Sequence, residues 1–421
     1  MKANISLGFI LAASAALALP SVDPANVTMT QDAGGKMTIG YVLTGEPAVI
    51  TVDIQTNDGA NAWVSIGESN LRGFAGDANR LIQPDGGKVR TATWQPGLHW
   101  GGADVTGGNL RAVVNAWPTN NPPDIAVFSL SAASNVMFYT SLAALPYEPT
   151  NELYKTEFLV MKRCHAAGLR WNRGAPFGEA NRREGNDQHY EDPFVCTISA
   201  DYYIGLFELT RYQYDQVMTS ALYSYDDPVD ARKPKCTFSW EHCRGANATY
   251  DWPTKGHEVA STSLMGKLRA RTGYDFDLPT AAQWEYACRA GTATAFSNGT
   301  NDGYHIQDIA WTSENASAPQ EVGLLPANPW GFYDMHGNAS EWCLDYMCNY
   351  PYKYDCENGP DAPPKDHSYM NGAYRIAKGG GFALSGTFAR SGGITDWSAP
   401  SLNTDHGTQI GCRVSLPAVA R

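Results

Sequence analysis

The sequence predicts an α+β chain in which an all-β sandwich precedes an irregular, loop-rich domain. Three observations lead to this prediction. Short segments of alternating polarity, without intervening helices, fill residues 26–145, as in antiparallel sandwiches. A proline-containing stretch at 146–150 then reads as a junction. Beyond it the chain is rich in Trp, Tyr and Gly, and two helical patterns stand out.

The N-terminus has the pattern of a secretory signal peptide over residues 1–18. An apolar run from Ile5 to Leu19 follows a lysine, and Ala16-Leu17-Ala18 supplies a small-residue cleavage site. The run is short for a membrane span, and no later run of about 18 apolar residues follows. We therefore expect a secreted or periplasmic protein with no membrane span after cleavage.

Bulk composition excludes one class of partner. The 421 residues carry a formal charge of -12 and a pI near 5.2. Surfaces that bind phosphate backbones usually show clustered Lys and Arg instead. We expect no nucleic-acid partner. A hydrophobic content of 43% and a prior of roughly 150 residues per domain suggest two folded domains.

The sandwich prediction depends on four expected strands. Ile50, Val52 and Ile54 alternate with polar residues, so one face of this strand should be buried and the other exposed to solvent. The remaining expected strands are 90–94, 111–117 and 125–130. This domain, of immunoglobulin or fibronectin type, contains no residue with an obvious catalytic role.

Both helical patterns in the second domain begin at a threonine. Thr210 can cap a helix that runs to about Met218. Thr280 and Gln283 form a capping box at the start of the second helix, and Gly291 should stop it.

The nine cysteines permit disulfides if the chain is exported. The pairs Cys236 with Cys243 and Cys348 with Cys356 could close short loops. Because nine is odd, at least one thiol stays unpaired within the chain. Neither pair has the Cys-x-x-Cys spacing of a zinc site, so a structural role is favoured.

Five blocks in the second domain resemble the formylglycine-generating-enzyme or sulfatase-modifying-factor family, and they occur in the family's order. The blocks are 202–210, YYIGLFELT; 278–291, LPTAAQWEYACRAG; 328–343, NPWGFYDMHGNASEWC; 378–382, KGGGF; and 411–414, GCRV. The resemblance implies a modified C-type-lectin fold over residues 150–416.

The resemblance also implies a structural calcium ion. Family members bind calcium at the third block, and the ligands carry over to Asp334, Gly337, Ala339 and Glu341. Carboxylates and carbonyls in such a loop are the oxygens that calcium prefers. The alternative is that Asp334 and Glu341 only cap turns. His336, in the same block, is expected to pack or hydrogen-bond rather than bind metal.

The family's catalytic chemistry is not expected here. Family enzymes oxidise a substrate cysteine with copper held by two thiolates five positions apart, and soft thiolates suit Cu(I). Leu384 and Ala389 stand at those two positions. Cys412 replaces the phenylalanine of a motif that is ordinarily core. We expect no copper and no catalytic residue.

The segment between Gly381 and Ile410 has the character of a binding face, because it mixes aromatic and polar groups on Gly/Ser-rich loops. In relatives of the lectin fold this stretch binds ligands. An equally open reading is that single aromatic residues here are core. The candidate ligand-binding residues are Phe382, Leu384, Thr387, Phe388, Asp396, Trp397 and His406.

These observations favour an exported binding or display protein built on a calcium-stabilised domain without formylglycine-generating activity. Its partner would be a protein or a glycan at the C-terminal loop face. The alternative is an enzyme of the family, a protein-modifying oxidase or sulfatase maturation factor with an unrecognised site. A purely structural component is a third hypothesis.

Overall fold

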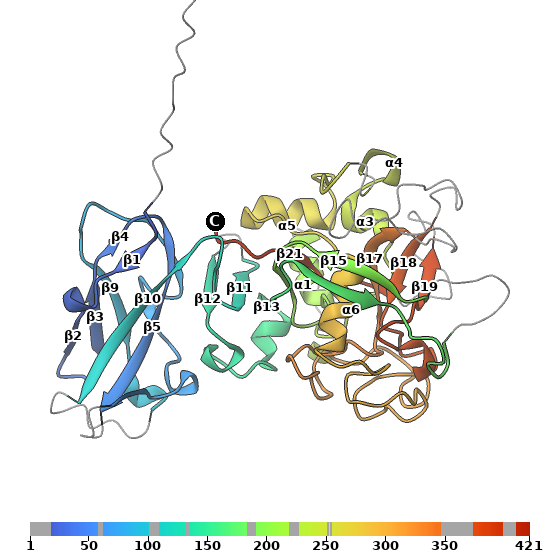
Figure 1. Ribbon diagram of the computed structural model, residues 1–421, viewed down its shortest axis with the longest axis horizontal. Coiled ribbons are helices and arrows are strands. Elements are labelled where there is room, and N and C mark those ends of the chain that lie inside the picture. Colours follow the sequence, from blue (N-terminus) through green and yellow to red (C-terminus); the bar gives the residue numbers. More distant parts are fainter. Residues whose placement is uncertain are drawn as a thin grey trace, which may run out of the picture. The chain divides into compact units, whose positions relative to one another are not determined.

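The chain folds into two compact units (Figure 1). The N-terminal unit comprises Met1–Gly67 and Gly73–Thr119, and the C-terminal unit comprises Glu68–Arg72 and Asn120–Arg421. The computed structural model describes residues 18–57, 62–100, 109–131, 135–182, 191–218, 227–250, 252, 255–346, 374–398 and 410–421. Within these ranges no helix has both the length and the apolar character needed to cross a membrane.

The N-terminal unit is built from antiparallel strand pairs, as the alternation predicts. One sheet has the order β2-β3-β9-β7, a second has the order β10-β5-β6 with β8 also on β5, and β1 pairs with β4. The strands are β1 Ser21–Val22, β2 Thr28–Gln31, β3 Met37–Tyr41, β4 Leu43–Thr44, β5 Ala48–Asn57, β6 Trp63–Ser65, β7 Ala75–Gly76, β8 Arg80–Ile82, β9 Arg90–Trp94 and β10 Leu110–Pro118.

Strand β5 follows the expected alternation with one exception. Ile50, Val52 and Ile54 are buried, as predicted. Thr51, expected on the solvent-exposed face, is buried too. Its hydroxyl oxygen accepts a 2.9 Å hydrogen bond from the indole N–H of Trp117. A large aromatic residue on the neighbouring strand β10 therefore covers part of the face that polarity alone marks as exposed.

The predicted boundary at 145–150 is wrong, because the structure divides the chain after Thr119. Strands β11 (Ile125–Ser129) and β12 (Val136–Tyr139) belong to the C-terminal unit, where β11 pairs with β13 (Phe158–Cys164). The reason is burial. Ile125 and Val127 pack in one cluster with Leu206 and Phe207 of the C-terminal unit. Local alternation identifies a strand but not the sheet that it joins.

The C-terminal unit is strand-rich and irregular, with several small sheets. Its largest sheet has the order β12-β11-β13-β16-β21, a second has β19-β18-β17-β20, and β14 pairs with β15. Only β17 and β20 pair in parallel among the strands described. The further strands are β14 Leu169–Arg173, β15 Phe194–Ile198, β16 Tyr202–Gly205, β17 Ser340–Tyr346, β18 Arg375–Lys378, β19 Asp396–Ser398, β20 Ile410–Gly411 and β21 Ser415–Pro417.

Helices in this unit are short and include both predicted ones. They are α1 Arg211–Met218, α2 Pro228–Ala231, α3 Trp240–Arg244, α4 Asn247–Tyr250, α5 Leu264–Thr272 and α6 Ala281–Arg289. The capping box of Thr280 and Gln283 starts α6 as expected, but the helix ends at Ala290, whose φ of 46° is left-handed. Gly291 follows that turn instead of making it.

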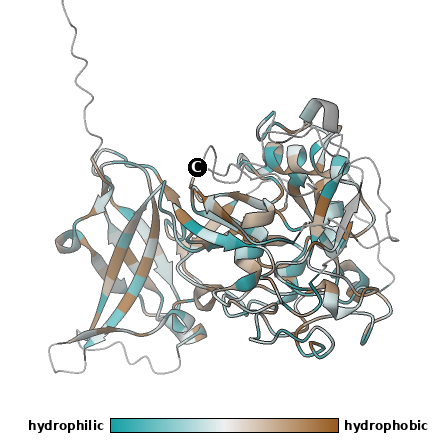
Figure 2. Cartoon of the chain, turned by 45° about the vertical axis from the view of Figure 1, so that its right-hand side comes forward, coloured by the Kyte–Doolittle hydropathy of each residue, from teal (hydrophilic) through white to brown (hydrophobic). Residues whose placement is uncertain are grey.

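The core around α6 combines large aromatic rings with aliphatic side chains. Trp284 of α6 is fully buried and packs in one cluster with Tyr202, Phe332 and Ile376 from three other segments. Figure 2 shows hydrophobic stretches on strands of both units, interleaved with hydrophilic ones. Large rings fill a core that short helices and strands alone would leave open.

Candidate functional site

Three buried carboxylates meet where β16, the 334–341 loop and β17 converge. Glu208 accepts hydrogen bonds from Asn338 Nδ2 at 2.7 Å and from the backbone N–H of Ala339 at 2.8 Å. Asp334 accepts one from the N–H of Gly323 at 2.7 Å. Glu341, the third carboxylate, is fully buried on β17.

Arg413 is the main cation that faces this carboxylate group. Its Nη2 lies 2.8 Å from Oε1 of Glu341, and Trp284 Nε1 donates to the other oxygen at 2.5 Å. Both oxygens of Glu341 therefore already have partners. Asp334 keeps Oδ1, for which no protein donor is described.

The pKa values of Glu208 and Asp334 are raised, first by burial and then by neighbouring negative charge. Burial, followed by the neighbouring Asp334 and Glu341, raises the pKa of Glu208 well above its usual value. Burial also raises the pKa of Asp334 to about 6, although the Gly323 N–H and Arg413 oppose the shift. Three buried carboxyl groups face two cations, Arg413 and Lys155, and a bound cation would favour the ionised form of the carboxyl groups.

The two carboxylates among the four expected calcium ligands are oxygen donors of the kind that calcium takes, but both oxygens of Glu341 already have protein partners. Asp334 lies in the loop before β17 with a left-handed φ of 55°, and Glu341 lies on β17 itself. Among the described residues, no group of three or more His, Cys, Asp and Glu is placed as a metal site, and the expected set holds only two such side chains. Glu208 is the one additional acidic group that sequence reasoning missed.

The two positions expected for copper thiolates are built into the loop after β18. Leu384 is half-buried, and its carbonyl accepts a 2.9 Å hydrogen bond from Ser313 N–H. Ala389 is fully buried, and a side chain added at Gly380 would collide with it. Neither residue carries a sulfur ligand.

A cysteine and a histidine lie near these positions, but they form no reactive pair. Cys288 Sγ is 3.8 Å from Nε2 of His336 and 3.4 Å from Oγ of Ser391. Burial raises the pKa of Cys288 to about 12 and lowers that of His336 to about 4, so both groups are neutral near pH 7. A thiolate nucleophile is disfavoured in this environment.

His336 is held by neighbours on both ring nitrogens, which fits its expected packing role. Nδ1 lies 2.7 Å from the carbonyl oxygen of Ala389, and Nε2 lies 3.0 Å from Oγ of Ser297. Since a neutral ring has one donor and one acceptor, Nδ1 carries the proton and Nε2 accepts. The ring thereby connects the 334–341 loop to the 384–389 loop.

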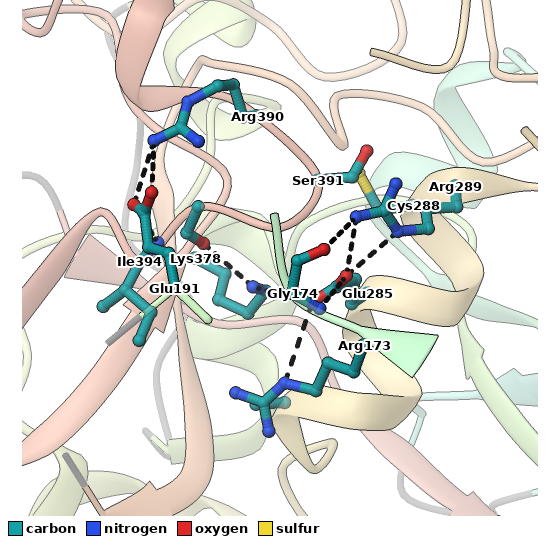
Figure 3. Close-up of polar contacts among 12 residues, drawn as sticks. Arg173, Gly174, Glu191, Glu285, Cys288, Arg289, Lys378, Arg390, Ser391 and Ile394 are labelled. Carbon is teal, nitrogen blue, oxygen red and sulfur yellow. Dashed lines mark hydrogen bonds and ion pairs between the residues drawn. The ribbon is translucent and has the colours of Figure 1, made fainter. Parts of the chain in front are cut away.

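A second buried charge network surrounds Glu285 of α6 (Figure 3). Lys378 Nζ lies 3.4 Å from one carboxylate oxygen, and Arg289 Nη2 lies 2.9 Å from the other. Arg173 lies 3.7 Å away, and the N–H of Gly174 donates at 2.8 Å. Burial alone would raise the pKa of Glu285, but the three cations hold it below its usual value.

The network fixes the turn that carries the candidate binding loop. Lys378 ends β18 and also donates to the carbonyl of Gly393 at 2.8 Å, across the loop. Arg390 binds both oxygens of Glu191, at 2.9 and 2.7 Å, and both side chains are almost fully buried (Figure 3). The loop is thus anchored at its two ends by buried ion pairs, and sequence reasoning identified neither pair.

The candidate ligand-binding residues are only partly described. Phe382, Leu384, Thr387 and Phe388 are half-buried, so each combines a packed part with an accessible part. The backbone of Asp396 and Trp397 lies in β19, paired with β18. His406 lies outside the described residues.

A separate cavity of about 400 Å³ lies beside β21 and the start of α6. Trp252, Leu278 and Leu416 supply apolar lining, and His257 and Asp277 are on the same wall. His257 Nδ1 is 2.8 Å from Oδ2 of the buried Asp277. The volume is within the range of small-ligand pockets. Nothing in the local sequence marks this cavity, because its walls come from distant segments.

Comparisons with known proteins relate the C-terminal part of the chain to one family. Residues 175–415 match the model of the sulfatase-modifying factor enzyme 1-like domain. The chain is 26% identical to the chaperone protein LppX of Paenibacillus barcinonensis over 258 residues, covering 52% of this chain and 82% of LppX. It is 28% identical to the formylglycine-generating enzyme of Bos taurus over 186 residues, covering 39% of this chain and 47% of that enzyme.

Solved structures give a weaker likeness. The variable protein 1 of Treponema denticola is 20% identical, with a TM-score of 0.44, covering 62% of this chain and 95% of that chain. The chain spans about half the length of the bovine enzyme. Because the family model covers more than half of the chain, this protein belongs to the formylglycine-generating-enzyme family through its sulfatase-modifying factor enzyme 1-like domain.

Proposed function

We propose that the chain is an exported binding or display protein whose family domain does not generate formylglycine. The observation that carries the proposal is the pair Leu384 and Ala389 at the expected thiolate positions. An aliphatic side chain cannot hold Cu(I), which prefers soft sulfur ligands. The expectation of no bound copper follows from the same two residues.

Other described thiols give no substitute for that pair. Cys288 contacts Ser391, which lies two residues after the 384–389 loop, and it is buried with a high pKa. A copper site needs accessible thiolates that a substrate cysteine can reach. The inward, neutral state of Cys288 supports a packing role.

The binding half of the proposal rests on the loop after β18. Phe382, Thr387 and Phe388 are half-buried on this loop. Contacts of Lys378 and Arg390 hold the loop in place. Rigidly supported aromatic groups lose little entropy on binding, which favours their use in protein or glycan recognition. The relative named as a chaperone gives a precedent for a non-catalytic role within this set.

The proposal includes a structural calcium ion at Asp334, Gly337, Ala339 and Glu341. Its support is the excess of buried negative charge, in which Glu208 joins the two carboxylates of the loop. When bound, calcium would neutralise this group and hold the loop. The protein's own residues already orient the carboxylates through Arg413, Trp284 and backbone N–H groups.

A second candidate function is a protein-modifying oxidase or sulfatase maturation factor. It is favoured by the relatives named formylglycine-generating enzymes, one of them 28% identical to this chain. Such an activity would need a site other than Leu384 and Ala389. The two functions make opposite predictions for one assay.

The assay incubates purified protein with Cu(I), dioxygen and a sulfatase peptide that contains cysteine. The formylglycine-generating enzyme of Bos taurus serves as the positive control. The double variant Leu384→Cys with Ala389→Cys is the matched variant, and its Cu(I) affinity is measured in parallel. We expect no aldehyde from the wild type and tighter Cu(I) binding by the double variant. Aldehyde formation by the wild type would refute the binding-protein proposal.

A further inference from the structure

The cavity beside β21 and the start of α6 lies within the C-terminal unit. Its volume of about 400 Å³ is large enough for a small organic molecule. Segments that are far apart in the sequence form its described lining, which includes 199–202 and 415–417. That lining contains none of the candidate residues of the loop after β18 and none of the expected calcium ligands. The cavity is therefore distinct from the candidate binding loop and from the calcium loop.

The buried Arg244 holds one wall of this cavity in place. Its Nε lies 2.7 Å from Oδ1 of Asp277, a residue that is only 3% exposed. Its Nη1 and Nη2 donate to the carbonyls of Tyr250 and Gly256, at 2.7 and 3.1 Å. Because Gly256 directly precedes His257, the same guanidinium fixes two residues of the lining, Asp277 and His257. A wall that is already ordered spares a ligand the cost of ordering it.

His257 adds a hydrogen-bond acceptor to this wall. Its Nδ1 lies 2.8 Å from Oδ2 of Asp277. Burial opposes the ionisation of Asp277, but Arg244 and His257 hold its pKa below the usual value. Since an ionised carboxylate can only accept, Nδ1 carries the proton of the neutral ring and Nε2 is an acceptor. Nε2 has no hydrogen-bond partner among the residues that the structure describes.

The charged groups of the described lining are acidic. Asp201 and Asp275 join Asp277 there, and none of the lining residues that the structure describes is a lysine or an arginine. The cations that pair with Asp201 and Asp275 are Arg163 and Arg421, which lie outside the described lining. A cleft lined by one sign of charge concentrates ligands of the opposite sign. The lining therefore disfavours an anion and favours a cation.

Ser415 brings a buried hydroxyl to the cavity. Two backbone hydrogen bonds of 2.8 Å join Ser415 to Asp277, so the position of the serine is fixed. The residue lines the cavity and is 5% exposed, yet its hydroxyl has no partner among the described residues. A buried hydroxyl without a partner costs free energy, which a hydrogen bond to a ligand would recover. This hydroxyl points to a ligand independently of the acidic groups.

An aromatic ring and two leucines supply the apolar part of the lining. Trp252 is 5% exposed, and the centroid of its ring lies 6.4 Å from that of His257. Leu278 and Leu416 line the same space. The face of a tryptophan ring attracts cations as well as apolar groups. The cavity thus combines an apolar surface with several acceptors and no described cationic side chain of fixed charge.

We propose that this cavity binds a small organic cation, a primary amine with an apolar body. An ammonium group has three N–H donors and no acceptor, which matches Asp275, Nε2 of His257 and the Ser415 hydroxyl. The apolar body of the ligand would lie against Trp252 and Leu416. The site goes beyond the proposed function, because it shares no described residue with the loop after β18.

The experiment titrates the full chain with three probes of nearly equal shape and different charge: 2-phenylethylamine, 2-phenylethanol and phenylacetate. The protein carries 5-fluorotryptophan, and Trp252→Phe identifies the fluorine NMR signal of Trp252. We expect the amine to shift this signal saturably and to bind roughly tenfold or more tightly than the alcohol, because a carboxylate attracts only the charged probe. Phenylacetate should leave the signal unchanged.

A matched pair of variants tests the role of charge. Asp275→Asn should remove the preference for the amine over the alcohol. Its side chain is about half exposed, so the variant should fold. Asp308→Asn, at an exposed aspartate outside the described lining, should keep the wild-type preference. Ser415→Ala should weaken binding of the amine as well.

Three results would overturn the proposal. The first is a wild-type Trp252 signal that the amine does not shift up to its solubility limit. The second is equal affinity of the wild type for the amine and the alcohol, which would make the cavity an apolar pocket without selection for charge. The third is an amine affinity that is the same in Asp275→Asn and in Asp308→Asn. The first two results come from the wild type alone and do not depend on any variant that changes the lining.

Discussion

Arg413 and Glu341 form an ion pair that is almost completely removed from water. Nη2 of Arg413 lies 2.8 Å from Oε1 of Glu341, with the side chains 0% and 1% exposed. Arg413 also donates to the carbonyls of Gly205 and Tyr333, at 3.0 and 2.8 Å. The guanidinium therefore connects β16, β17 and the 328–343 block through one side chain.

The first prediction concerns the loss of this arginine. Arg413→Leu leaves Glu341 buried without its cation, so the free energy of unfolding should fall by about 3–5 kcal/mol. Urea denaturation measures the change. Arg421→Leu is the control, because its pair with Asp275 is about half exposed and should change stability by less than about 1 kcal/mol. Equal effects of the two variants would contradict the structural role of the buried pair.

The second prediction concerns calcium. Chelation should lower the thermal midpoint, and added calcium should restore it, because a ligand that binds only the folded state stabilises it. At a calcium concentration of 100 times Kd the gain is about 2.7 kcal/mol. Differential scanning calorimetry gives the midpoint.

Two substitutions at one position sharpen the calcium test. Asp334→Ala removes the side-chain oxygen and should abolish the response to chelator. Asp334→Asn keeps one side-chain oxygen and should retain most of the response to chelator. A wild-type midpoint that does not move on chelation would show that exchangeable calcium does not occupy the loop.

The sequence predicted those parts of the fold that are encoded locally. The capping box at Thr280 starts α6 as expected, and Ile50, Val52 and Ile54 are buried on β5. In α1 the expected extent was right. Gln213 is buried because its side chain donates to the carbonyls of Tyr154 and Phe158, partners that periodicity cannot reveal.

The candidate site was predicted in composition but not in its supporting contacts. The 334–341 loop was picked out because the block 328–343 resembles the calcium-binding segment of the family. Glu208, Lys378 and Arg390 were missed, since each meets its partner across more than 90 positions. Buried ion pairs between distant segments leave no local signal, and the same is true of the cavity beside His257.

The third prediction concerns export. If residues 1–18 are a signal peptide, expression in a secretion-competent host should yield a mature chain that begins at Leu19. Intact-mass measurement and N-terminal sequencing of the exported protein identify the first residue. Replacing Ala16 and Ala18 with bulky residues should block processing, because signal peptidase requires small side chains there. A cytoplasmic, unprocessed wild-type product would contradict the proposed location.

The fourth prediction concerns Cys288. Because burial raises its pKa to about 12, the thiol should not react with iodoacetamide in the folded protein at pH 8. It should react fully in denaturant. Mass spectrometry of the peptide 281–289 measures both states. Rapid labelling of Cys288 under native conditions would instead indicate an accessible thiolate and would revive a catalytic role for its contact with His336.

The fifth prediction is a pH dependence that comes from His336. Burial lowers its pKa to about 4 from an ordinary value near 6.5, so the folded state favours the neutral ring more than the unfolded state does. The resulting stability is fully present above about pH 6.5 and is lost as the pH falls toward 4. A shift of this size corresponds to about 3 kcal/mol, which urea denaturation across that range can measure.

A non-titrating replacement separates this effect from general acid sensitivity. His336→Gln should be less stable at pH 7, because it cannot reproduce both hydrogen bonds of the ring, but it should lose less stability between pH 6.5 and 4. His305→Gln is the control, since that side chain is 82% exposed and should leave the wild-type profile unchanged. If His336→Gln and the wild type lose stability in parallel over this range, protonation of the buried ring is not the cause of the acid sensitivity.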